Sequence, residues 1–182
     1  MKTVLALTGP SGSGKSTLAA RLSEVYGFDA IEGSNVISQH ARLRGSPAPS
    51  TREQYEDFFR AEQHRAGMAW IAGELLRRTS NRLAYAGLRS KYDFARIHSA
   101  GGFIIALDCD PKTCLARSDP SDPKNPTTTE EYERHAQLQN SPDEYGSHLD
   151  WVIAHADRHI DTSLAIPEVN AQLDTIVGEL LV

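Results

Sequence analysis

The stretch Gly9-Pro10-Ser11-Gly12-Ser13-Gly14-Lys15-Ser16 decides the fold of this chain, and it reads G-x-x-x-x-G-K-S. The segment before it, residues 3–8, is short, apolar and partly β-branched, which predicts a buried strand. The segment after it places Leu18 and Leu22 four residues apart, on one face of a predicted helix. The sequence therefore predicts a glycine-rich turn that joins a strand to a helix.

A turn of this kind has the chemistry of a phosphate-binding loop. The glycines allow backbone angles that a side chain forbids, so the N–H groups can point inward at a helix N-terminus that favours anions. We expect Lys15 to reach the β and γ phosphates of ATP and the Ser16 hydroxyl to ligate Mg²⁺. The alternative, a turn with no ligand, is disfavoured by the full spacing and the Lys-Ser pair. The nucleotide-binding residues predicted in this way are Gly9, Ser11, Gly12, Ser13, Gly14, Lys15, Ser16 and Thr17.

The bulk composition is that of an ordinary globular protein. A chain of 182 residues predicts one domain over residues 1–182. The net charge of −5 produces no global attraction to nucleic acid, although residues 42–96 hold eleven Lys and Arg against six Asp and Glu and are net +5. A solvated helix face is the simpler interpretation of most of these charges. There is no predicted secretion signal or membrane span, so we expect a cytoplasmic protein without a membrane partner.

Apolar strands alternate with helices along the chain. The patterns predict strands at residues 3–8, 28–31, 82–86, 103–107 and 158–161, separated by helices that include one long helix from Ser50 or Thr51 through Leu75. Gly67 and Gly73 are expected to weaken or bend that helix. Ser34 and Ser90 are predicted helix caps. This alternation indicates an α/β fold with a parallel sheet and helices on both faces.

Two features of the predicted topology place a site. Ligands of parallel sheets bind beyond the carboxyl ends of the strands, so the loops at Gly9, Glu32, Gly87 and Cys109 are expected to share one edge. Cys109 itself is interpreted as a small buried residue.

Three prolines exclude regular structure from residues 118–127. We expect that segment to be a mobile, lid-like loop.

The order of these pieces resembles the P-loop nucleoside and nucleotide kinases, and most closely the small dephospho-CoA-kinase-like and adenylate-kinase-like members. The matching stretches are residues 9–17, 32–37, 87–90, 114–117 and 156–161. The resemblance implies a P-loop kinase fold with about five parallel strands, helices on both faces and a short lid. It also implies transfer of the γ-phosphoryl group of ATP to a hydroxyl or phosphate of a nucleotide-like acceptor.

Two positions depart from the family pattern. Many relatives carry Asp just before the turn that follows the third strand, where this chain has Ala86, so the carboxylate on the magnesium side is unassigned. Nucleoside monophosphate kinases usually carry Arg after the second strand to hold the acceptor phosphate, where this chain has Ser38. Similar sequences occur in viral kinases that phosphorylate a hydroxymethylated pyrimidine in DNA, whose neutral hydroxyl needs no phosphate clamp.

The predicted catalytic residues are Lys15, Glu32, Arg117 and Arg89. Glu32 ends the second strand, and a carboxylate there can orient an acceptor hydroxyl and take its proton; the alternative is a solvated acid. Asp29 is a weaker candidate at the start of that strand. Asp108 is a candidate on the magnesium side or a helix cap. Arg117 precedes the lid-like loop and Arg89 follows a strand end, so both are expected to contact phosphate or acceptor. The alternative for each is an ordinary surface arginine.

The identity of the acceptor stays open at this point. The net positive segment favours DNA as a partner, and the acidic total opposes it. A small-molecule nucleoside monophosphate or dephospho-CoA-type kinase is the first alternative. A module that binds ATP without transferring phosphate is the second, because Ala86 removes an expected carboxylate.

Overall fold

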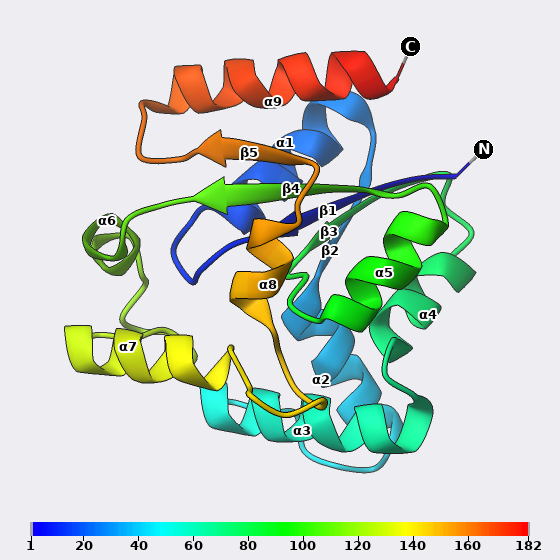
Figure 1. Ribbon diagram of the computed structural model, residues 1–182, viewed down its shortest axis with the longest axis vertical. Helices are drawn as coiled ribbons and strands as arrows, with labels where there is room; N and C mark the ends of the chain where they lie inside the picture. The colour runs from blue at the N-terminus through cyan, green and yellow to red at the C-terminus, as the bar shows by residue number, and fades with distance from the viewer. Residues whose placement is uncertain (1, 182) are drawn as a thin grey trace.

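The computed structural model describes residues 2–181 and forms an α/β fold around one five-stranded sheet (Figure 1). The strand order is β2-β3-β1-β4-β5, and every pairing is parallel. Parallel pairing directs all five carboxyl ends to the same edge of the sheet. The strands are β1 (Thr3–Thr8), β2 (Asp29–Glu32), β3 (Arg82–Ala86), β4 (Phe103–Asp108) and β5 (Arg158–Asp161).

Helices cover both faces of the sheet, as the sequence predicts. Helices α1 and α9 pack against one face, while α2, α3, α4, α5 and α8 lie on the other side (Figure 1). The helices are α1 (Lys15–Tyr26), α2 (Gly33–Leu43), α3 (Arg52–Ala66), α4 (Trp70–Arg77), α5 (Lys91–Ser99), α6 (Pro111–Ala116), α7 (Thr129–Leu138), α8 (Leu149–Ala154) and α9 (Ile166–Leu180).

The central strand β1 shows why the sheet is buried on both faces. Val4 and Ala6 belong to the core cluster beneath α2–α5, whereas Leu5 and Leu7 belong to the cluster beneath α1 and α9. Successive side chains of a strand point to opposite faces, so a strand covered on both sides must be apolar throughout. This is the reason that residues 3–8 read as a continuous apolar run.

Most predicted helix ends are confirmed. Gly27 ends α1 in the left-handed region (φ 67°), a conformation that glycine adopts readily. Thr51 accepts a hydrogen bond from the Gln54 N–H at the start of α3, and Ser90 accepts from Tyr92 and Asp93 at the start of α5. The predicted cap at Ser34 is wrong, because α2 begins at Gly33 and Ser34 lies inside its first turn.

The predicted long helix over residues 52–75 is wrong. The chain leaves α3 at Gly67, which has φ 102°, and re-enters a helix only at Trp70. That backbone conformation is open to glycine and strained for other residues, so Gly67 breaks the helix where the sequence suggests only a bend. The break turns α4 back against α5 and beneath the sheet.

A buried carboxylate connects α2 to α3. The side chain of Glu62 is 1% exposed and lies 2.9 Å from His40 Nε2, 3.3 Å from Arg44 Nη2 and 3.0 Å from Arg65 Nη1. The guanidinium groups of Arg44 and Arg65 offset the cost of burying that charge, with the His40 ring beside them. The contact holds α2 and α3 together as one arm beside the sheet edge. No helix among residues 2–181 is long and apolar enough to cross a membrane.

Candidate active site

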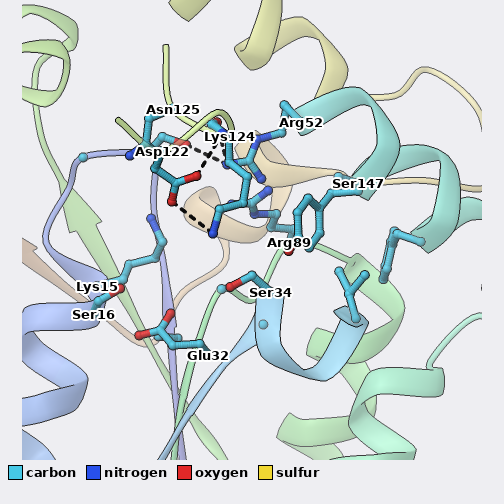
Figure 2. A pocket seen from close by; sticks show the side chains of 18 of the residues that line it. Lys15, Ser16, Glu32, Ser34, Arg52, Arg89, Asp122, Lys124, Asn125 and Ser147 are labelled. Carbon is cyan, nitrogen blue, oxygen red and sulfur yellow. Dashed lines mark hydrogen bonds and ion pairs between the residues drawn. The ribbon is translucent and has the colours of Figure 1, made fainter. Parts of the chain in front are cut away.

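A cavity of about 470 Å³ opens at the carboxyl ends of β1, β2 and β3. Its lining comes from the glycine-rich loop, the end of β2, the first turns of α2 and α3, the β3–α5 turn and the loop over residues 118–127. Figure 2 shows Lys15, Ser16 and Glu32 together on one side, with Arg52 and Arg89 across from them. The shared edge that the parallel topology predicts is therefore confirmed, although Cys109 is not part of the lining and is only half-buried.

The glycine-rich loop has the backbone that its sequence predicts. Gly9, Gly12 and Gly14 all have positive φ, at 140°, 81° and 89°. At Gly12 an added Cβ would lie 2.1 Å from the carbonyl oxygen of Cys114, so no side chain fits at this position. Gly14 directly precedes α1, whose N-terminal amides face the cavity edge. This geometry suits a phosphate cradle.

Lys15 lines the cavity within range of the positive charges of Arg89 and Arg52. Its Nζ donates to the Gly9 carbonyl at 2.8 Å and to the Pro10 carbonyl at 2.6 Å. Burial, followed by the positive charges of Arg89 and Arg52, lowers the pKa of Lys15 to about 7. Its ammonium is therefore only half populated near neutral pH, and an anion placed beside it would stabilise the charged form.

Glu32 stands next to the position of the missing acid. It is the register partner of Ala86 across the β2–β3 pair, and it lines the cavity with Lys15 and Ser16. A carboxylate one strand away from Ala86 thus faces the same space. The exposed Asp29 lies at the far end of β2, and Asp108 is exposed and accepts from His159 Nδ1 at 3.0 Å. Neither of these two lines the cavity.

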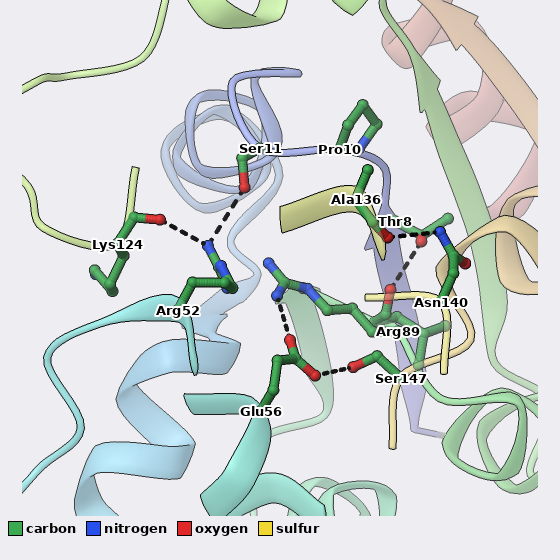
Figure 3. A network of polar contacts seen from close by, with 12 residues as sticks. Thr8, Pro10, Ser11, Arg52, Glu56, Arg89, Lys124, Ala136, Asn140 and Ser147 are labelled. Atoms are coloured by element: carbon green, nitrogen blue, oxygen red, sulfur yellow. Dashed lines mark hydrogen bonds and ion pairs between the residues drawn. The ribbon is translucent and has the colours of Figure 1, made fainter. Parts of the chain in front are cut away.

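Arg89 is held in place by a short polar network (Figure 3). Its Nη1 donates to Glu56 Oε1 at 3.3 Å, and Ser147 Oγ donates to Glu56 Oε2 at 2.6 Å. The backbone of the same turn is fixed from both sides, because Thr8 Oγ1 donates to the Leu88 carbonyl at 2.8 Å and the His148 N–H donates to the Arg89 carbonyl at 2.7 Å. The predicted position of Arg89 in the site is consistent with this arrangement.

Arg52 and Glu56 are site residues that the sequence did not reveal. The sequence predicts a solvated helix face for most of the charges between residues 42 and 96, but both side chains are 7% exposed and both line the cavity. They lie on the first two turns of α3, which pass beside the sheet edge. No local pattern distinguishes them, because their burial depends on contacts with the glycine-rich loop and with Ser147, far away in the sequence.

The loop over residues 118–127 contains no regular structure and contributes to the cavity wall, as a lid would. Lys124 Nζ lies 3.1 Å from Asp122 Oδ2 and 5.7 Å from the centre of the Tyr55 ring on α3. Arg117, which precedes the loop, also lines the cavity, and its Nη1 donates to the Thr162 carbonyl at 2.8 Å. The mobility of the loop stays a prediction.

The residues present fit Mg²⁺. Among the residues that the structure describes, no group of three or more His, Cys, Asp or Glu side chains forms a metal centre. Mg²⁺ bound with a nucleotide needs no such centre, since it keeps several waters and uses one or two protein ligands together with substrate phosphates. The Ser16 hydroxyl is an oxygen ligand of this kind on the cavity wall.

Known proteins share this architecture. The AAA domain family matches residues 5–139. Similar solved structures are shikimate kinase from Aquifex aeolicus vf5 (15% identity, TM-score 0.56, 98% of each chain) and shikimate kinase from Acinetobacter baumannii in complex with shikimate (16%, TM-score 0.54, 98% of this chain and 94% of that one). A gluconokinase from Sinorhizobium meliloti 1021 is also similar (15%, TM-score 0.54, 98% of this chain and 95% of that one). A search of curated proteins found no match.

These findings confirm the predicted P-loop kinase fold. The finer resemblance to dephospho-CoA kinases, adenylate kinases and viral DNA kinases stays a prediction. Because the matched family spans most of the sequence, from β1 to the end of α7, the chain belongs to the AAA domain family and has the fold of the P-loop kinases.

Proposed function

We propose that this protein is an ATP-dependent kinase that transfers the γ-phosphoryl group to a hydroxyl of a small, nucleotide-like acceptor. One observation carries the proposal: Lys15, Ser16 and Glu32 face the same cavity at the carboxyl edge of the sheet. A phosphate cradle and a carboxylate in one enclosed space are the parts that phosphoryl transfer to a hydroxyl requires.

Each residue has a distinct role in this proposal. The loop amides and Lys15 hold the phosphates of ATP, and bound Mg²⁺, held by Ser16, would neutralise phosphate charge. Glu32 orients the acceptor hydroxyl and accepts its proton as the new O–P bond forms, a contribution of about 10²–10⁴-fold in rate. Arg117, at the base of the lid-like loop, neutralises charge on the transferred group. Transfer therefore depends mainly on positioning and electrostatics.

The shape of the cavity supports a small acceptor with a ring. Beyond Glu32 the wall is formed by the apolar or aromatic side chains of Ile37, Tyr55, Phe59, Ile71 and Tyr85. A planar or compact ring fits such a wall better than a flexible polar chain does.

Part of the positive charge of residues 42–96 is paired with carboxylates, which weakens its support for a DNA acceptor. Arg44 and Arg65 pair with Glu62, and Arg77 pairs with Glu74. Paired cations release fewer counterions and bind a nucleic-acid backbone less strongly. A hydroxymethylated pyrimidine within DNA remains the second candidate acceptor, and it rests on the resemblance stated above.

The test is an acceptor screen with γ-labelled ATP and Mg²⁺. The panel contains nucleosides, nucleoside monophosphates, dephospho-CoA, small hydroxy acids and hydroxymethylpyrimidine DNA. Transfer to at least one free acceptor is expected, and it should be lost in Lys15→Ala and Glu32→Gln but kept in Asp29→Asn, a control on the exposed end of the same strand. Transfer confined to DNA would favour the second candidate. ATP binding without any transfer would favour a non-catalytic module.

A further inference from the structure

Arg52 is a buried cation without a carboxylate partner among the described residues. Its side chain contacts only two oxygen atoms, since Nη2 lies 3.3 Å from Ser11 Oγ and 3.4 Å from the Lys124 carbonyl. Both distances are long for hydrogen bonds, and the buried Nε has no partner at all. The residue is 7% exposed, yet it lines the cavity.

Such a group needs an explanation. A buried charge without a counter-charge is costly, and proteins keep one mainly where a ligand supplies the missing partner. Burial and the neighbouring Arg89 lower the pKa of Arg52 to about 9, which leaves the guanidinium charged at neutral pH. Glu56 and Asp122 act on this charge from a distance, but no carboxylate among the described residues forms a direct ion pair with it.

The guanidinium group of Arg89 lies at the same part of the cavity as that of Arg52. Figure 3 shows the end groups of Arg52 and Arg89 next to one another, reached from α3 and from the β3–α5 turn. Arg89 is oriented by Glu56, which Ser147 holds in turn, and this leaves its other N–H groups free to face the cavity. Lys124 of the lid-like loop also lines the cavity, but Asp122 pairs with it.

The phosphates of ATP do not account for this pair by themselves. The loop amides and Lys15 already form the proposed donor cradle, and Arg52 and Arg89 lie across the cavity from Lys15 (Figure 2). Arg52 touches the cradle at Ser11 Oγ, and Tyr55 and Phe59 line the same cavity. Ser38, where nucleoside monophosphate kinases have the arginine for the acceptor, instead hydrogen-bonds the Tyr55 hydroxyl at 2.9 Å. Arg52 brings a guanidinium to this side of the cavity from a different helix.

We propose that Arg52 and Arg89 together bind an oxyanion carried by the acceptor, a phosphate or a carboxylate. The acceptor is then an anionic hydroxy compound, in contrast to the neutral acceptor that Ser38 suggests. This inference rests on the proposed function, because it names the chemical class of that site's acceptor. Two planar guanidinium groups suit an oxyanion because each can donate two parallel hydrogen bonds to it.

The test measures anion binding apart from turnover. The donor site is first saturated with Mg²⁺ and a non-hydrolysable ATP analogue, and inorganic phosphate or acetate is then titrated by calorimetry. The variants are Arg52→Gln, Arg89→Gln and Arg134→Gln. Arg134 is a matched control, because it is exposed and pairs with Glu53 on the outer side of α3. Arg52→Lys keeps a positive charge at this position without the guanidinium group. Thermal melting of each variant distinguishes a loss of anion binding from a loss of folding.

We expect phosphate or acetate to bind the saturated wild-type complex, and the stronger of the two probes identifies the oxyanion class. Binding should weaken about tenfold or more in Arg52→Gln and Arg89→Gln, the loss expected for hydrogen bonds to a charged group. Arg134→Gln should bind the anion as the wild type does, and its affinity for the ATP analogue should change less than about twofold. The inference is overturned if neither anion binds, or if Arg52→Gln melts normally and binds unchanged. Anion binding that depends on Arg52, in a protein that phosphorylates no acceptor, would reject the proposed function but not this site.

Discussion

Proton uptake on ATP binding is the sharpest consequence of the Lys15 environment. The pKa of Lys15 is lowered to about 7, so about half of the side chains in the free protein are neutral at pH 7 and about nine tenths at pH 8. Triphosphate oxygens beside Lys15 favour the ammonium and raise its pKa in the complex. Binding of ATP should therefore take up about half a proton at pH 7 and about nine tenths of a proton at pH 8.

The same linkage fixes the direction of the pH dependence of affinity. Below the pKa of the free protein the ammonium is present before and after binding, so affinity is independent of this group. As the pH rises above 7, each complex formed must recover a proton, and affinity for ATP falls towards tenfold per pH unit. The fall continues until the pH reaches the raised pKa of Lys15 in the complex.

Calorimetry in two buffers with different ionisation enthalpies measures the uptake directly. Lys15→Arg is the matched control, because a guanidinium stays charged over this range. The difference in proton uptake between wild type and Lys15→Arg isolates the lysine from the titration of ATP itself. Equal uptake in the two proteins, or a wild-type affinity that is constant from pH 7 to pH 9, would refute the assigned environment of Lys15.

Three further predictions concern other parts of the molecule. Glu32→Gln should lower kcat by about 10²–10⁴-fold with unchanged ATP affinity in steady-state kinetics, whereas Asp29→Asn should have little effect; equal losses in both would contradict the role of Glu32. Gly12→Ala should weaken ATP binding at least about tenfold, because the added Cβ would clash with the Cys114 carbonyl and because Gly12 has a positive φ. A dissociation constant equal to that of the wild type would show that the loop can rearrange. Glu62→Gln should lower the free energy of unfolding by about 1–3 kcal/mol in urea denaturation, since Arg44, Arg65 and the His40 ring lose their shared buried carboxylate; no change would mean that solvent replaces it.

The sequence predicted those parts of the fold that depend on neighbouring residues. The strand positions, the caps at Thr51 and Ser90 and the glycine-rich loop all follow from short local patterns. Glu32 could be placed at the sheet edge because a strand end and a topology rule suffice to locate it.

What the sequence missed depends on distant contacts. Arg52 and Glu56 look like ordinary surface charges until α3 is seen beside the glycine-rich loop and Ser147. The sequence around Gly67 also does not reveal that the helix breaks there. A glycine inside a helix can be tolerated, and the packing of the following segment decides whether the helix continues. Asp108 was a reasonable candidate by position, but the end of β4 directs it to His159 and solvent.

The tie between α3 and the segment after α7 divides the site into two parts that can change separately. Gln63 on α3 bonds both the N–H and the carbonyl of Gly146, and Ser147 donates to Glu56 two turns earlier on the same helix. None of these contacts involves residues 9–17, the proposed binding loop for ATP. Substitutions near residues 141–147 can thus reshape the acceptor end while the nucleotide end keeps its geometry, a division that lets one scaffold acquire new substrates during evolution.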